Sequence, residues 1–323
     1  MRLLVTGAGG FVGGHLLEHV RREAPSARVF GVVQPHGSSR RAAALTRILE
    51  ADLDDPQAAL AAVEEARPDA IVHLAGQSSV QQSWLDPGGT LRTNVLGVVH
   101  VLDAARRLGL KPAVLVVGSA EEYGPVAESA LPIRETTPLQ PASPYAVSKA
   151  AQAALALLYG PQGGMRVVLT RTFHHTGPGR GEAFAESSFA RQIAEIESGL
   201  RPPLIEVGNL DALRDFTDVR DVVRAYLLLL EKGQAGEAYN VCSGRGRRIR
   251  ELLDLLLSAS AARVEVRVDK ERLRPADVPA QVGDPSRLRE ATGWEPEVPL
   301  EQTLGDLLAD WRARVAGSLG AGS

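Results

Sequence analysis

Two residues four positions apart, Tyr145 and Lys149, have the types and spacing of a proton-transfer pair. Side chains at this spacing lie on one face of a helix, and Ser143 and Pro144 are residues that favour a helix start. A lysine ammonium beside a phenol favours the phenolate and lowers the pKa of the tyrosine. A tyrosine tuned in this way can exchange a proton with a carbonyl or alcohol oxygen near neutral pH.

Lysine is rare in this chain, which gives Lys149 more weight. Of the 36 basic residues only four are lysine, namely Lys111, Lys149, Lys232 and Lys270. Arginine is bulkier and does not titrate, so a site that needs a compact cation near a tyrosine would resist that replacement. An ordinary surface pair is the alternative interpretation, because such a spacing also arises by chance.

The turn that follows the first apolar run reads TGAGGFVG and predicts a dinucleotide site. Gly7 permits the tight turn, Gly10 lets a pyrophosphate approach the backbone, and Gly13 lets the next helix pack on the strand. The N-terminus of that helix then faces the phosphates. A glycine motif indicates dinucleotide binding more strongly when it lies, as here, between a first strand and a first helix.

The residues after the second strand bear on which dinucleotide binds. An acidic residue usually grips the adenosine ribose there, but Gln34 occupies the position and the next carboxylate is Glu50. Arg40 and Arg41 lie between them, and arginine can bind a 2′-phosphate through two hydrogen bonds. We therefore favour NADP(H), with NAD(H) as the alternative. In that case both arginines would be solvated loop charges or would contact a neighbouring subunit.

Short apolar runs alternate with helical patterns through the N-terminal half. The expected strands are 3–6, 29–33, 46–50, 70–74, 113–117 and 166–171. The expected helices are 11–22, 56–66, 87–107 and 144–158. This alternation predicts an α/β fold with a Rossmann-type, doubly wound parallel sheet.

After Thr172 the pattern loosens, which suggests a smaller C-terminal substrate-binding lobe. Helices are expected near 186–198, 219–231 and 249–261, with a return to the sheet near 238–241. The expected parts are a dinucleotide-binding domain over 1–172 with a return segment near 207–241, a mainly substrate-binding lobe over 173–316, and a flexible tail over 317–323.

Composition limits the possible partners. The 323 residues suffice for a large core, and a net charge of −3 with dispersed arginines argues against nucleic acid. The single cysteine, Cys242, excludes an internal disulfide and a cysteine-based zinc site, and it fits a reducing cytoplasm. We expect no signal peptide and no membrane span, since no run of 18 apolar residues occurs. His174 and His175 lack further ligands at suitable spacing, so no metal site is expected.

Taken in order, these motifs resemble the extended short-chain dehydrogenase/reductase family, in its nucleotide-sugar branch. The resemblance covers essentially the whole chain and rests on the glycine turn, Asp52-Leu53, HLAGQ at 73–77, Asn94, Ser119, and the Tyr145–Lys149 pair. It implies hydride transfer between a nicotinamide and a sugar carbon, with Tyr145 moving the proton and Lys149 holding the ribose. The cofactor-binding residues that it implies are Gly7, Gly10, Phe11, Val12, Gly13, Asp52, Leu53, Leu74, Ala75, Gly76, Asn94, Tyr145, Lys149 and Thr172.

Ser119 would bind the substrate oxygen beside Tyr145 according to the same resemblance. Independently, Ser119 closes an apolar strand, where an open α/β sheet places its ligands. Segments 171–180, 207–226 and 273–284 resemble members that act on GDP-linked hexoses. The substrate-binding residues implied are Gln77, Ser79, Ser119, Glu121, His174, Arg180, Val207, Asn209, Arg214 and Arg274.

Arg214 and Arg274 would grip the substrate diphosphate, a task that suits arginine, although a surface ion pair is the alternative for each. At position 174 relatives often carry asparagine, so the contact expected of His174 departs from the family pattern.

Two reactions of that branch differ in the machinery they need. A GDP-mannose 4,6-dehydratase also needs a base for the C5 proton and an acid for the C6 hydroxyl. Glu121 occupies the base position, whereas Ala120 puts a methyl group where dehydratases carry a polar residue. A 4-ketoreductase needs only Ser119, Tyr145, Lys149 and the cofactor. We therefore expect reduction of a GDP-4-keto-6-deoxyhexose to a GDP-6-deoxyhexose of the GDP-rhamnose type.

Other functions stay open at this point. They are GDP-mannose 4,6-dehydratase, another nucleotide-sugar epimerase or dehydratase, and a non-catalytic NADP(H)-binding sensor, which would have little reason to keep Ser119, Tyr145 and Lys149 together. The resemblance also implies a homodimer through the helices at 87–107 and 144–158, or a tetramer that uses loop 38–41.

Overall fold

A computed structural model of the protein describes residues 1–35, 46–272 and 278–320. Its central sheet has seven parallel strands in the order β10-β6-β5-β4-β1-β2-β3. The strands are β1 (Arg2–Thr6), β2 (Arg28–Val33), β3 (Arg47–Glu50), β4 (Ala70–His73), β5 (Ala113–Ser119), β6 (Arg166–Thr172) and β10 (Ala238–Val241). This sheet confirms the predicted doubly wound Rossmann-type class.

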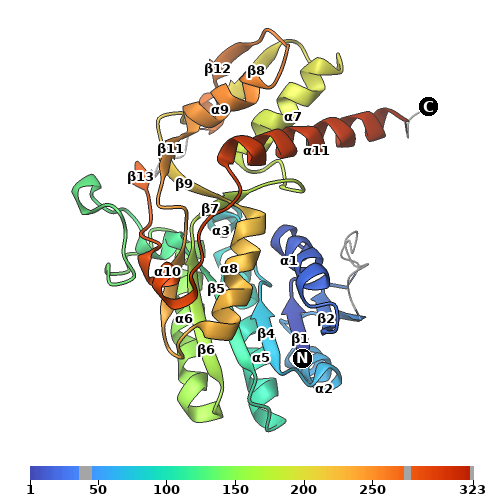
Figure 1. Ribbon diagram of the computed structural model, residues 1–323, viewed down its shortest axis with the longest axis vertical. Helices are drawn as coiled ribbons and strands as arrows, with labels where there is room; N and C mark the ends of the chain where they lie inside the picture. The colour runs from blue at the N-terminus through green and yellow to red at the C-terminus, as the bar shows by residue number, and fades with distance from the viewer. Residues whose placement is uncertain (36–45, 273–277, 321–323) are drawn as a thin grey trace.

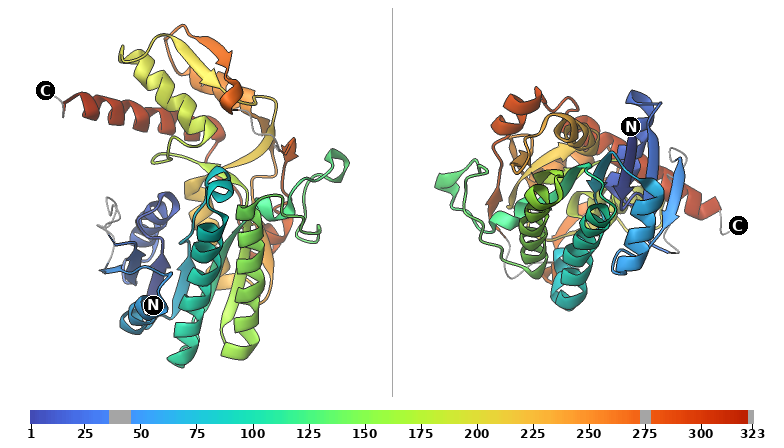
Figure 2. Two further views of the ribbon diagram at one scale, coloured as in Figure 1. Left: turned by 180° about the vertical axis from the view of Figure 1, so that it is seen from behind. Right: turned by 90° about the horizontal axis from the view of Figure 1, so that it is seen from below.

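Helices cover both faces of the sheet (Figure 1). On one face lie α1 (Phe11–Glu23), α8 (Val219–Lys232) and α10 (Ser286–Thr292). On the other lie α2 (Pro56–Ala66), α5 (Gly97–Arg107) and α6 (Pro144–Gly163), and Figure 2 shows α5 and α6 side by side there. Both faces must be apolar in such a sandwich, which explains why the strands read as continuous hydrophobic runs.

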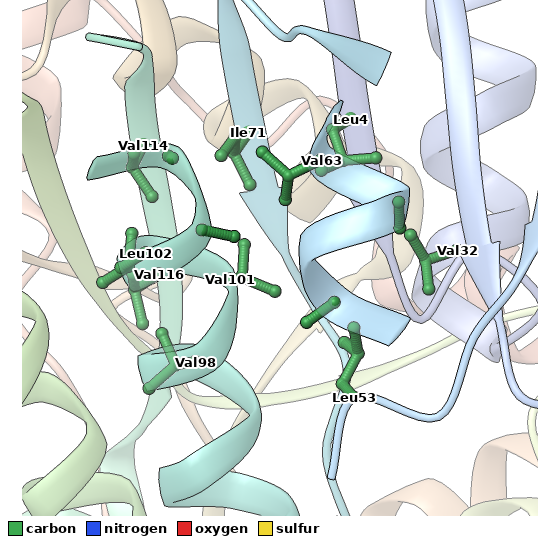
Figure 3. Close-up of a cluster of buried hydrophobic side chains, with 14 of the residues drawn as sticks. Leu4, Val32, Leu53, Val63, Ile71, Val98, Val101, Leu102, Val114 and Val116 are labelled. Carbon is green, nitrogen blue, oxygen red and sulfur yellow. The ribbon is translucent and has the colours of Figure 1, made fainter. Parts of the chain in front are cut away.

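One hydrophobic cluster shows how the sequence pattern fixes this packing. Figure 3 shows Leu4, Ile71 and Val114 of the sheet facing Val63 of α2 and Val101 of α5. All five side chains are 1% exposed or less. Burying each such side chain stabilises the fold by about 1.5–3 kcal/mol, which holds α2 and α5 against the sheet.

The helix expected over 87–107 is interrupted. The chain forms α3 (Val80–Leu85) and α4 (Pro87–Leu91), then the π-helical turn η2 (Arg92–Leu96), before α5 begins. A π turn inserts one extra residue per turn and frequently occurs at functional sites. Here it contains Asn94, which is fully buried.

The smaller lobe lies beyond the carboxyl ends of the strands of the central sheet (Figure 1). It holds a four-stranded sheet and a two-stranded one around a separate hydrophobic core. The elements are β7 (His174–Thr176), β8 (Leu204–Val207), β9 (Leu213–Asp218), β11 (Gly246–Arg248), β12 (Glu265–Val268), β13 (Ala280–Gln281), α7 (Ala185–Glu197), α9 (Ile249–Ser258) and α11 (Leu300–Gly320).

The C-terminal half differs from the sequence expectation in two ways. The short strands of the lobe, together with α10 and α11, were not expected, whereas α7 and α9 begin within a residue of their predicted starts. Helix α11 also continues through Gly320, into the range predicted as a tail from 317. Within the described ranges, no helix is both long and apolar enough to span a membrane.

Candidate active site

The glycine turn between β1 and α1 has no room for a side chain at Gly7 or for one at Gly13 where the helix meets it. Gly7 has a φ of 67°, and a Cβ there would lie 2.8 Å from the Ala75 nitrogen. A Cβ on Gly13 would lie 2.5 Å from the Gly7 oxygen. Helix α1 is capped by Gly10, which offers no side-chain cap, and its first turn contains no acidic residue. Its first amide groups and its dipole therefore suit a phosphate, so these residues fit a dinucleotide.

A second segment, 74–77, lies against this turn and is held from behind. The Thr6 hydroxyl accepts a hydrogen bond from the Ala75 amide at 3.2 Å. The Asn94 side chain accepts from the Gln77 amide at 2.8 Å and donates to the Gln77 carbonyl at 3.1 Å. It also donates to the Ser148 hydroxyl at 2.8 Å. Asn94 therefore acts as a buried brace that links the end of β4 to α6.

Ser119 and Tyr145 meet at the end of β5. A side-chain hydrogen bond joins the Ser119 hydroxyl and the Tyr145 phenol. Burial raises the pKa of Tyr145 to about 12, although this hydrogen bond and the charge of Arg180 act to lower it. The expectation that Lys149 lowers the pKa of Tyr145 below its usual value is thus wrong for the protein alone, because desolvation of the phenolate outweighs the attractive interactions.

Lys149 lies one turn further along α6 and is only 7% exposed. Its ammonium donates a 3.0 Å hydrogen bond to Oε1 of Gln152, a residue that the sequence analysis did not single out. Burial lowers the pKa of Lys149 to about 8, and the charge of Glu122 opposes that shift. The site thus contains a compact cation whose protonation changes close to neutral pH.

Glu122 is a second residue that the sequence analysis missed. Its Oε1 accepts a hydrogen bond from the Ser119 amide at 2.8 Å, and its Oε2 lies 3.3 Å from Nε of Arg171. The Ser119 side chain in turn accepts from the Glu121 amide at 3.2 Å, which completes a capping box. A Ser-x-x-Glu spacing is the sequence signal that could have found it.

Arg180 extends from the lobe toward the glycine turn. Its guanidinium carbon lies 4.9 Å from the ring centroid of Phe11 and 3.3 Å from that of Phe184. Its Nε lies 3.8 Å from Oε1 of Glu186. Because its charge also acts on Tyr145, Arg180 belongs to the same site as the proton-transfer residue.

Several predicted substrate residues have partners within the protein. Gln77 and Ser79 bond to each other, and the Ser79 hydroxyl accepts from the Gln82 amide. The ring of His174 lies 5.5 Å from that of Phe216. Glu121 is half-buried beside Tyr145, and its charge raises the pKa of the phenol.

The remaining predicted residues contact other parts of the fold, and Thr172 is the strand partner of Ser119 across β5 and β6. The Thr172 hydroxyl bonds to that of Tyr226 at 2.8 Å, and Val207 is buried in the core of the lobe. Arg214 donates to the carbonyls of Leu213 and Pro279, and Asn209 accepts from the Asp211 amide. Asp52 is exposed after β3, and Leu53 is buried beside it. Three of the predicted site residues, Arg40, Arg41 and Arg274, lie outside the described ranges.

Comparison with known proteins agrees with this geometry. A family model described as GDP-mannose 4,6 dehydratase matches residues 4–307. The chain is 41% identical to GDP-6-deoxy-D-mannose reductase of Pseudomonas aeruginosa PAO1 over 97% of its own length and 98% of the relative's. It is 32% identical to GDP-mannose 4,6-dehydratase of Yersinia enterocolitica, covering 80% of this chain and 77% of that one.

A solved structure of RMD from Pseudomonas aeruginosa complexed with NADPH matches the fold with a TM-score of 0.87 at 39% identity, over 97% of this chain and 100% of that one. The family match spans both the sheet and the lobe, so it includes the glycine turn, Ser119, Tyr145 and Lys149. The chain therefore belongs to the GDP-mannose 4,6 dehydratase family, in agreement with the nucleotide-sugar resemblance of its motifs.

Proposed function

We propose that this protein reduces the 4-keto group of a GDP-4-keto-6-deoxyhexose to an alcohol, with NADP(H) as its cofactor. The observation that carries the proposal is the hydrogen-bonded Ser119–Tyr145 pair, one helical turn from the buried Lys149. The extensive similarity to a GDP-6-deoxy-D-mannose reductase supports the same substrate class.

The chain's own residues would bind the carbonyl and supply the proton. The Ser119 hydroxyl orients the carbonyl oxygen next to the Tyr145 phenol, which is protonated at neutral pH because its pKa is about 12. When bound, the reduced nicotinamide supplies the hydride that adds to C4. The Tyr145 proton then passes to the oxygen, and the Lys149 cation stabilises the phenolate left behind until solvent returns a proton.

The cofactor would be held by the glycine turn and by segment 74–77. Gly7 lets the turn approach the backbone of Ala75 and Gly13 lets α1 pack on the turn, while Gly10 would let the pyrophosphate approach the N-terminus of α1. NADP(H) rather than NAD(H) is supported by Gln34 in place of an acidic residue and by the NADPH in the similar Pseudomonas structure.

GDP-mannose 4,6-dehydration is the second candidate, and Glu121 is the observation that favours it. Glu121 is half-buried and close enough for its charge to act on Tyr145. Ala120 beside it is 2% exposed and offers no proton to a departing C6 hydroxyl. The reductase reaction therefore needs only groups that the chain has, whereas the dehydratase reaction also needs an acid that Ala120 cannot supply.

Two incubations distinguish these candidates. One contains GDP-mannose with catalytic NADP⁺, and the other contains GDP-4-keto-6-deoxymannose with NADPH; products are separated by chromatography and identified by mass. NADPH oxidation with the keto sugar alone supports the reductase. Loss of water from GDP-mannose without net cofactor use makes the protein the dehydratase. If neither tube shows a reaction, the GDP-hexose assignment is overturned.

We also propose a homodimer that acts in the cytoplasm. Large apolar side chains are exposed along α3, η2 and α6, namely Trp84, Leu85, Leu96, Val147 and Leu158. Such apolar side chains on neighbouring elements favour association, and a Leu158→Glu variant should shift the mass measured by light scattering toward the monomer. The buried thiol of Cys242 fits a reducing compartment.

A further inference from the structure

Gln152 lies under the reacting groups, and both ends of its side-chain amide are used. Its Oε1 accepts the Lys149 ammonium at 3.0 Å, and its Nε2 donates to the Val117 carbonyl of β5 at 3.1 Å. The side chain is fully buried. The carbonyl of Val117 requires a donor and the ammonium requires an acceptor, so these partners fix the orientation of the amide.

We propose that Gln152 is a positioning residue of this active site, which anchors the Lys149 ammonium to β5 through a neutral hydrogen bond. The inference rests on the proposed function in taking Lys149 as the cation of the reaction. Because β5 also ends in Ser119, the same strand would then place both the carbonyl-binding hydroxyl and the ammonium.

The neutrality of Gln152 matters because few charges act on Lys149. No ion pair joins Lys149 to a carboxylate in the described parts of the chain. The charged and titratable groups that act on it are Glu122 of η3 (Ala120–Tyr123) and His73 of β4, whose pKa burial lowers to about 3. A neutral acceptor holds the ammonium in place and raises its pKa less than a carboxylate would, which agrees with the lowered pKa of Lys149.

The titration of Lys149 tests this directly. With four lysines in the chain, lysine labelled with ¹³C at Cε should give few resonances, and a Lys149→Arg variant assigns the one of interest. In ligand-free protein we expect the Lys149 midpoint to rise by about one pH unit or more in Gln152→Glu and to fall in Gln152→Leu. Gln152→Met, close in shape, serves if the leucine variant does not fold.

A matched control is available on the same helix. Gln162 is exposed near the end of α6, about 20 Å from Lys149 at 1.5 Å per residue. Gln162→Glu should leave the midpoint unchanged. Equal Lys149 midpoints in the parent, Gln152→Glu and Gln152→Leu would overturn the proposal.

Turnover provides a second readout, separate from the first. If the parent reduces the keto sugar, Gln152→Leu should lower kcat about tenfold or more, and the pH dependence of kcat should move with the Lys149 midpoint. If the parent reduces no sugar nucleotide, the proposed function fails, but the lysine titration still decides whether Gln152 controls Lys149. A change in kcat with no change in the midpoint counts against the positioning role.

Discussion

The Ser119 amide donates a 2.8 Å hydrogen bond to a buried carboxylate, that of Glu122. This contact fixes the end of β5, where the substrate oxygen is expected. Burial raises the pKa of Glu122, whereas the Ser119 amide and the charge of Arg171 lower it. Gly118 leaves the room that this contact needs, since a Cβ there would lie 2.3 Å from Oε1 of Glu122.

Replacing Glu122 should therefore destabilise the whole protein. Glu122→Ala leaves the half-buried Arg171 without its carboxylate partner, and breaking a buried pair costs about 3–5 kcal/mol. Glu122→Gln keeps an acceptor for the Ser119 amide and should cost less. Urea unfolding measures both values; a Glu122→Ala protein within about 0.5 kcal/mol of the parent would show that the pair contributes little.

Tyr145→Phe should abolish most turnover while leaving the fold intact. The variant keeps the ring but has no proton to give to the substrate oxygen, and general acid catalysis contributes about 10²–10⁴-fold. We expect that loss in kcat, with NADPH affinity measured by fluorescence almost unchanged. Turnover at the parental rate would remove Tyr145 from the mechanism.

The parts of the site that sequence could predict are those with local signals. The glycine turn, the Tyr145–Lys149 spacing and the strand that ends at Ser119 each follow from neighbouring residues. The π turn at Asn94 has no such local signal, and the Asn94 side chain bonds to Gln77 and Ser148, which lie 17 and 54 residues away.

The same distinction explains the other differences. The sign of the Tyr145 pKa shift depends on burial, which spacing does not reveal. In the lobe, β9 pairs with β7, β11 and β13, so the strands of the lobe depend on contacts between segments that are distant in sequence. The role of Gln152 depends on the carbonyl of Val117, 35 residues away.

Asn94→Ala should destabilise the protein and loosen the cofactor site. The change leaves the Gln77 amide and carbonyl and the Ser148 hydroxyl without their buried partner, and each such loss costs about 1–3 kcal/mol. We expect a lower melting temperature and weaker NADPH binding. Ser148→Ala removes only one of these contacts, so it should have a smaller effect. An Asn94→Ala protein with parental melting and affinity would contradict the role of Asn94 as a brace.

The charge of Lys149 should destabilise the native protein at neutral pH, compared with an uncharged side chain at the same position. Burial lowers its pKa from an ordinary 10.5 to about 8. Between these values the unfolded chain binds more protons than the native one, so this residue makes stability rise with pH through that window. Below pH 8 both states are protonated and the full cost applies, on the order of 3 kcal/mol.

Lys149→Met removes that cost. We expect the variant to be inactive, yet about 3 kcal/mol more stable than the parent at pH 7 by urea unfolding. The difference should shrink as the pH rises from 8 toward 10.5, because the parental lysine loses its proton in the native state. Titrating groups that do not interact with Lys149 cancel in the comparison, since both proteins carry them; Glu122 and His73 interact with Lys149, so their pKa values also change in the variant. A difference in stability that does not change with pH across this window would mean that Lys149 titrates in the folded protein as it does in the unfolded chain.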